Sequence, residues 1–202
     1  MYALKSGRNE LSTGDSCYTL TIITSTYLME KINLYNASIP PLKTALQNLS
    51  GLIDKAVIHA DMKKGEVTHL FAEKLVFDQF PLSRQIRMVC DNAKGTAARL
   101  AGIDIPKFAD EEKTAEEFKV RIEKTIAFLD TIKPEQIIGN EEIKVTLPYF
   151  PGKHFVGLEY LTYYALPNFY FHLTTAYSIL RKNGVDIGKS DYLSLSAFLH
   201  DE

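Results

Sequence analysis

Apolar residues recur at steps of three and four in four separate segments of the chain, and this periodicity restricts the fold more than any other feature. Because an α-helix turns by about 100° per residue, this spacing places the apolar side chains of each segment on one helical face. Thr114 and Glu117 form a capping-box pattern at the start of the third segment, and Gly102 follows the end of the second. The predicted helices lie near residues 39–60, 81–101, 114–132 and 157–182.

The period changes between the third and the fourth helical segment. Ile143, Val145 and Leu147 alternate with polar residues, as in a β-strand with one buried face. A second short run follows a Pro-Gly turn, so the sequence predicts a β-hairpin near residues 143–156. Four core-facing helices with connections of moderate length favour an all-α fold, an up-and-down four-helix bundle with a small β-hairpin before the last helix.

The composition is that of a globular protein with one core. The chain has 202 residues, of which 46% are hydrophobic, enough to bury a core but short for two domains. A net charge of -2 without a basic helix face argues against a nucleic-acid partner. No apolar run approaches the about 20 residues of a transmembrane helix, so we expect no membrane partner and a cytoplasmic location. A homodimer formed by helix packing remains open.

Residues 1–28 differ in composition from the rest of the chain. They carry Ser, Thr, Gly and scattered charges without a periodic apolar face. Threonines interrupt the apolar part too often for a signal peptide, and Glu10 and Asp15 do not suit a transit peptide. We expect an N-terminal extension that is disordered or precedes a physiological start at Met29, with residues 29–202 forming one helical-bundle domain. A short edge strand is the alternative.

The last helical segment carries polar side chains beside its apolar stripe. Asn168 and His172 are four residues apart and share one helical face. On the second segment, Gln85 and Asn92 lie on the edge of the stripe in the same way. If the two edges face each other, these four side chains line a pocket between the helices, and a few convergent polar groups among apolar walls are typical of small-molecule sites. The alternative is a core histidine that is hydrogen-bonded to a neighbouring helix and binds no ligand.

Four stretches of the sequence carry a resemblance to a known family: DQFPLSRQ at 78–85, AKGTAARLAG at 93–102, NFYFHLTTAY at 168–177 and IGKSDYL at 187–193. Together they resemble an uncharacterised branch, a domain of unknown function, of the DinB/YfiT-like metalloenzyme superfamily. The resemblance spans roughly residues 32–193. It implies a DinB-like four-helix bundle whose pocket holds a divalent metal through three histidines, one on the second helix and two spaced by four on the last.

This chain departs from the three-histidine set that the resemblance implies. The pair on the last helix appears as Asn168 and His172, and residues 82–100 contain no histidine. Amide oxygens are poor ligands for zinc or nickel, so His172 would hold such a metal with an incomplete ligand set. The sequence favours a small-molecule-binding protein with a degenerate metal site around His172. The alternative is a metal- or thiol-dependent transferase or hydrolase with His172 as the candidate catalytic residue, acting as sole metal ligand or as general base.

Other ionisable residues have simpler explanations. Asp91 lies opposite the apolar stripe of its segment, so we expect it to be solvated near Lys94. Cys17 and Cys90 are far apart in different settings, which predicts neither a disulfide nor a CxxC metal site, and Cys90 is expected to be a buried thiol. His59 is expected to pack against or cap the end of the first helix.

Deleting residues 1–28 should leave the melting temperature nearly unchanged, because these residues offer no apolar face to the bundle. Thermal denaturation of the full chain and of residues 29–202, followed by circular dichroism, makes the comparison. Ordinary surface changes alter stability by about 0.5 kcal/mol, so a loss of more than about 2 kcal/mol would mean that the extension packs onto the bundle.

Overall fold

The computed structural model of the chain describes residues 32–193. The predicted extension at residues 1–28, together with Cys17 and His200, lies outside the described residues. No helix within the described range is long and apolar enough to span a membrane.

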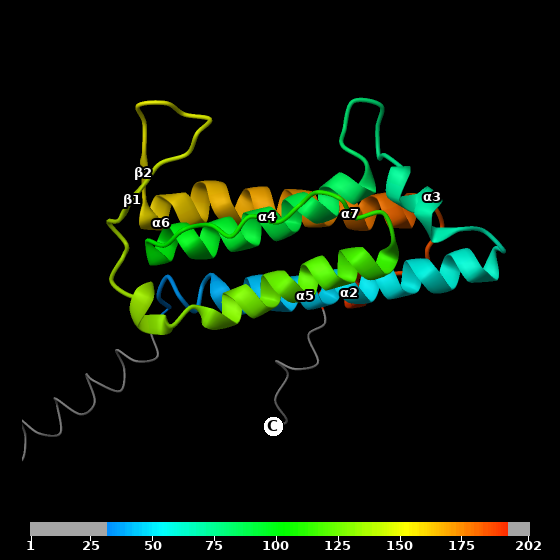
Figure 1. Cartoon of the computed structure of the whole chain (residues 1–202), viewed down its shortest axis with the longest axis horizontal. Helices are drawn as coiled ribbons and strands as arrows, with labels where there is room; N and C mark the ends of the chain where they lie inside the picture. Colours follow the sequence, from blue (N-terminus) through cyan, green and yellow to red (C-terminus); the bar gives the residue numbers. More distant parts are fainter. Residues whose placement is uncertain (1–31, 194–202) are drawn as a thin grey trace, which may run out of the picture. The chain divides into compact units, whose positions relative to one another are not determined.

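Four long helices pack side by side in the described domain (Figure 1). The prediction of an all-α bundle with a small hairpin before its last helix is confirmed, and the first three predicted helices are correct to within two residues at each end. The long helices are α2 (Ile39–Met62), α4 (Leu82–Ala101), α5 (Ala115–Thr131) and α7 (Leu166–Lys182). Shorter elements are α3 (Val67–Ala72), η1 (Pro134–Gln136), β1 (Lys144–Val145), β2 (Phe155–Val156), α6 (Gly157–Glu159), η2 (Tyr160–Ala165) and α8 (Lys189–Leu193).

Local sequence signals set the helix ends. The Thr114 hydroxyl oxygen accepts a hydrogen bond from the amide of Glu117 at 3.2 Å, and the Glu117 carboxylate accepts one from the amide of Thr114 at 2.9 Å. This is the predicted capping box, which satisfies amide groups that have no partner within the helix. Gly102 ends α4 with a φ of 66°, a conformation that glycine adopts without steric cost.

The predicted helix at residues 157–182 is helical over its whole length, with α6, the π-helical η2 and α7 in direct succession. Residues Tyr160–Ala165 form a π-helical stretch, directly ahead of Pro167. Proline has no amide hydrogen, and its ring would clash with the carbonyl of Tyr163, four residues earlier. The wider π turn relieves both constraints. The β1–β2 hairpin precedes this stretch, with Val145 opposite Phe155 in an antiparallel pair.

The core lies where the apolar faces of the four long helices meet. Leu46 of α2, Ile86 of α4, Phe118 of α5 and Phe169 of α7 are fully buried. Burying a side chain of this size stabilises the folded state by about 1.5–3 kcal/mol. The periodic stripes therefore account for the association of the helices.

Helices α4 and α5 run in the same direction, whereas an up-and-down order would reverse α5. Arg87 near the start of α4 has its guanidinium carbon 5.6 Å from the ring of Phe118 near the start of α5. At the other end, the carbonyl of Leu100 accepts a hydrogen bond from Asn140, which follows α5. The connection over residues 103–114 runs back along α4 to the start of α5 (Figure 1). The segment is long enough to let α5 run parallel to α4. We call residues 103–114 the crossover.

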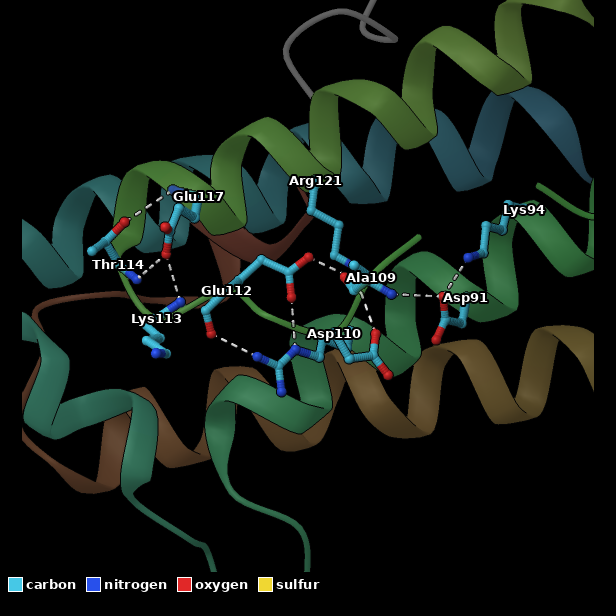
Figure 2. Close-up of polar contacts among 10 residues, drawn as sticks. Asp91, Lys94, Ala109, Asp110, Glu112, Lys113, Thr114, Glu117 and Arg121 are labelled. Atoms are coloured by element: carbon cyan, nitrogen blue, oxygen red, sulfur yellow. Dashed lines mark hydrogen bonds and ion pairs between the residues drawn. The ribbon is translucent and has the colours of Figure 1, made fainter. Parts of the chain in front are cut away.

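A buried arginine attaches the crossover to both helices (Figure 2). Arg121 of α5 is only 2% exposed. One terminal nitrogen, Nη1, donates to the carbonyl of Ala109 at 2.9 Å and to the Glu112 carboxylate at 2.8 Å, while Nη2 donates to Asp91 of α4 at 2.8 Å. Arg87 of α4 also donates to the Glu112 carboxylate at 2.7 Å. One guanidinium thus joins α4, the crossover and α5.

The charges of this network support one another. Burial alone would raise the pKa of Glu112, but the hydrogen bonds from Arg121 and Arg87 outweigh it and the pKa is lowered. The carboxylate therefore stays ionised. Asp91 forms the expected ion pair with Lys94 at 2.7 Å, with 34% of its side chain exposed. Its second partner, Arg121, is a contact that sequence analysis did not identify.

Replacing Arg121 by methionine should lower the free energy of unfolding by about 3–5 kcal/mol, because Glu112 and Asp91 lose a buried partner. Urea denaturation followed by circular dichroism measures the loss. The control is Lys119→Met, which removes an exposed partner of Asp54 on the same helix and should change stability by less than about 1 kcal/mol. Equal effects of the two variants would contradict the role given to Arg121.

Candidate functional site

Helices α4 and α7 bring the four predicted site residues together in pairs. The Nδ1 atom of His172 lies 2.7 Å from Oε1 of Gln85, and Nδ2 of Asn168 donates to Oδ1 of Asn92 at 2.7 Å. Because α4 and α7 run antiparallel, the pairs follow one another along the contact between the helices. We call these four side chains the polar ladder. Its geometry agrees with the polar edges that the sequence predicts.

Main-chain carbonyl groups fix the orientation of both α4 amides. Nε2 of Gln85 donates to the carbonyl of Phe80 at 3.1 Å, and Nδ2 of Asn92 donates to the carbonyl of Met88 at 2.8 Å. The oxygen of Gln85 therefore faces His172, and since this oxygen can only accept, Nδ1 of His172 carries the hydrogen. The remaining ring nitrogen, Nε2, keeps its lone pair. Sequence analysis did not identify these carbonyl groups, because any residue type supplies one.

Burial keeps the His172 ring neutral. The residue is 6% exposed and its partner Gln85 is 1% exposed. Removal from water disfavours the charged imidazolium, so the pKa of His172 is lowered from its ordinary value. At neutral pH the side chain is an uncharged imidazole that donates through Nδ1.

The Nε2 atom of His172 is reached by solvent. It forms no hydrogen bond to any of residues 32–193. Within that range the buried side-chain atoms without a hydrogen bond are Oε1 of Gln79 and Nε of Arg121, and Nε2 of His172 is not one of them. The exposed fraction of His172 therefore includes its lone-pair nitrogen. The ring of Phe171 stands edge-on to the imidazole, with 5.2 Å between the ring centroids, and is 54% exposed, so an apolar surface borders the imidazole ring.

Four cavities formed by the described residues lie away from the polar ladder. They have volumes between about 330 and 740 Å³, and none of the four is lined by a ladder residue. The four side chains that the sequence predicts to line a pocket lie together at the contact of α4 with α7.

The donor atoms around His172 do not fit zinc or nickel. No group of three or more His, Cys, Asp or Glu side chains that could hold a metal ion occurs in the part of the chain that the structure describes. The neighbours of His172 are amides, which bind these metals poorly. Elsewhere, His69 and His154 are exposed, and half-buried His59 lies in the last turn of α2.

Cys90 is the buried thiol that the sequence predicts. It is fully buried in α4, and burial raises its pKa to about 12. A thiol in this state stays protonated at neutral pH and is inert as a nucleophile. It packs in the core and takes no part in the polar ladder.

Comparisons with known proteins agree with this fold. The family DUF1993, a domain of unknown function, matches residues 34–193. A crystal structure of a DinB family member from Shewanella denitrificans is 39% identical and has a TM-score of 0.76. The similarity covers 79% of this chain and 91% of that one. A comparison with curated proteins finds no match.

The lowered pKa of His172 predicts a specific loss of stability in acid. In the unfolded chain a histidine takes up a proton near pH 6.5, whereas the folded His172 does so only at lower pH. The contribution of neutral His172 to the free energy of unfolding is complete above about pH 6.5. It is lost, by up to about 1.4 kcal/mol per pH unit, as the pH falls from there through the pKa of the folded state. Urea denaturation between pH 7 and pH 5 measures this. The loss should shrink in His172→Gln and persist in His154→Gln, and an unchanged profile in His172→Gln would refute it.

Proposed function

The chain belongs to the DUF1993 family, a branch of the DinB-like superfamily. We propose that it binds a small molecule through the Nε2 atom of His172. In this proposal the three-histidine metal site of the superfamily is degenerate here. Asn168 stands one helical turn before His172 and donates to Asn92 of the facing helix. The last-helix position that would carry a second imidazole thus serves the contact between α4 and α7.

One observation carries the proposal: a buried, neutral imidazole is oriented by Gln85 and leaves its lone pair accessible to solvent. A histidine that served only the packing of the helices would need no accessible nitrogen. Metal-ligating histidines in proteins are oriented in the same way, by a hydrogen bond from the second ring nitrogen, and here the free nitrogen is offered to a small molecule. The ligand must therefore offer a hydrogen-bond donor to Nε2.

The surroundings suggest the class of ligand. Phe171 beside the ring exposes aromatic surface, whereas the ring of Phe80 is covered by the guanidinium of Arg84 at 3.7 Å. An uncharged acceptor atom next to an apolar surface suits a small, partly apolar molecule with a hydroxyl, thiol or amine hydrogen. The absence of a charged side chain from the ladder itself favours an uncharged donor group.

The fixed tautomer also supports a second candidate function. A neutral imidazole with a free lone pair can act as a general base, for example toward the hydrogen of a thiol. The protein would then be a thiol-dependent transferase or hydrolase with His172 as its base. Zinc or nickel held by His172 alone would be bound weakly, because the ladder adds only amides.

Thermal-shift measurements on the wild type and on His172→Ala test the binding proposal. The probes are cysteine and 2-mercaptoethanol as thiols, benzyl alcohol as an apolar hydroxyl donor, and zinc or nickel chloride. We expect an apolar hydroxyl or thiol probe to stabilise the wild type, by about 2.7 kcal/mol at 100 times its Kd, and to have no effect on His172→Ala. His154→Ala, which removes an exposed imidazole, is the control and should behave as the wild type.

Two other results decide against the binding proposal. If no probe shifts the wild type and His172→Ala is merely less stable, His172 has a packing role only. If zinc or nickel stabilises the wild type strongly and this effect disappears in His172→Ala, the metal-dependent alternative is favoured instead.

A further inference from the structure

The largest of the four cavities lies at the opposite end of α4 from Gln85 and has no residue in common with the polar ladder. Its volume is about 740 Å³, and it opens between the end of α4, the first residues of the crossover and the hairpin that precedes α6. Cavities of about 300–1,000 Å³ are typical of small-molecule sites. Three cationic side chains line it, those of Arg99, Lys144 and Lys153, against one carboxylate, that of Asp104.

Arg99 is held in place without a carboxylate partner. Its Nη1 atom donates to the hydroxyl of Tyr160 at 3.2 Å, and its guanidinium carbon lies 5.9 Å from the Tyr160 ring. In contrast to Arg87 and Arg121, Arg99 forms no ion pair with any carboxylate of residues 32–193. Its remaining N–H groups and its full charge are therefore available in the cavity.

A glycine one turn earlier makes room for this arginine. A Cβ atom on Gly95 would lie 2.5 Å from Nη1 of Arg99, closer than such atoms approach in proteins. Gly95 is buried in the middle of α4, where glycine destabilises a helix by about 0.5–1 kcal/mol relative to alanine. The helix thus contains an unfavourable residue at a position where a side chain would displace the Arg99 guanidinium.

The walls between the charges are largely apolar. Ile103, Ile105, Leu147 and Phe150 line the same cavity. A guanidinium binds a planar anionic group through two parallel hydrogen bonds, and lysines add attraction without fixing geometry. Apolar walls add affinity for the uncharged part of a ligand.

We propose that this cavity is a binding site for a small organic anion. The anionic group, a carboxylate or a phosphate, binds Arg99, with Lys144 and Lys153 at the rim, and the apolar part of the molecule lies against Ile103, Ile105 and Phe150. The site is independent of His172. Its residues lie between α4 and the hairpin, and none of them belongs to the polar ladder.

Titrations with benzoate, phenyl phosphate and benzyl alcohol test the proposal, with binding followed by ¹⁵N NMR of the full-length protein. We expect saturable shifts at the amides of residues 99–105 and 144–153 with at least one of the two anions, weakening as salt is raised. Benzyl alcohol, the neutral analogue, should bind here at least about tenfold more weakly, because it cannot form the charge-assisted pair with Arg99. Equal binding of the neutral analogue, or no binding of either anion, would overturn the proposal.

Variants separate the role of Arg99 from general effects on the fold. Arg99→Met and Gly95→Ala should each weaken anion binding by about tenfold, the first by removing the guanidinium and the second by displacing it. Gly51→Ala is the control for glycine replacement, since a Cβ there meets nothing within 4 Å. Gly51→Ala and His172→Ala should bind the anion as the wild type does. Unchanged binding by both Arg99→Met and Gly95→Ala would refute the site.

Discussion

The buried guanidinium of Arg121 is the interaction on which the arrangement of the helices depends. Its bonds to Asp91, Ala109 and Glu112 tie the crossover to α4 and α5 at once. With the crossover returning along the bundle, α5 lies parallel to α4, and the next long helix, α7, comes back antiparallel to α4. Gln85 can then face His172, and Arg99 can face Tyr160. The positions of both proposed sites thus depend on the direction of the crossover.

The sequence predicts the helices and the ladder because both depend on angular position around a helix. Helical spacing alone places Asn168 and His172 on one edge of the apolar face of their helix. When two such polar edges are buried against each other in a bundle, their side chains form hydrogen bonds. The direction of α5 is not predictable in this way. Arg121 stands three residues after Phe118, a position that sequence alone does not distinguish from a solvated one. Cavity volume depends on the packing of whole side chains, so the position of the cavity beside Arg99 is equally unpredictable from sequence.

The two proposed sites lie at opposite ends of α4 and differ in chemistry. Near the start of α4, this helix and α7 approach through uncharged amides and a neutral imidazole, which suits recognition of a hydrogen-bond donor. Near the end of α4, Arg99 donates to the hydroxyl of Tyr160 in η2 and has no carboxylate partner among residues 32–193, which suits an anion.

The protonation of the His172 ring at neutral pH is the most direct test of the account. NMR of protein labelled with ¹⁵N in histidine distinguishes a nitrogen that carries hydrogen from one that carries a lone pair. The account predicts hydrogen on Nδ1 and a lone pair on Nε2, since Oε1 of Gln85 can only accept. Hydrogen on Nε2, or a ring that is charged at pH 7, would contradict it, because the atom proposed to receive the ligand would then have no lone pair.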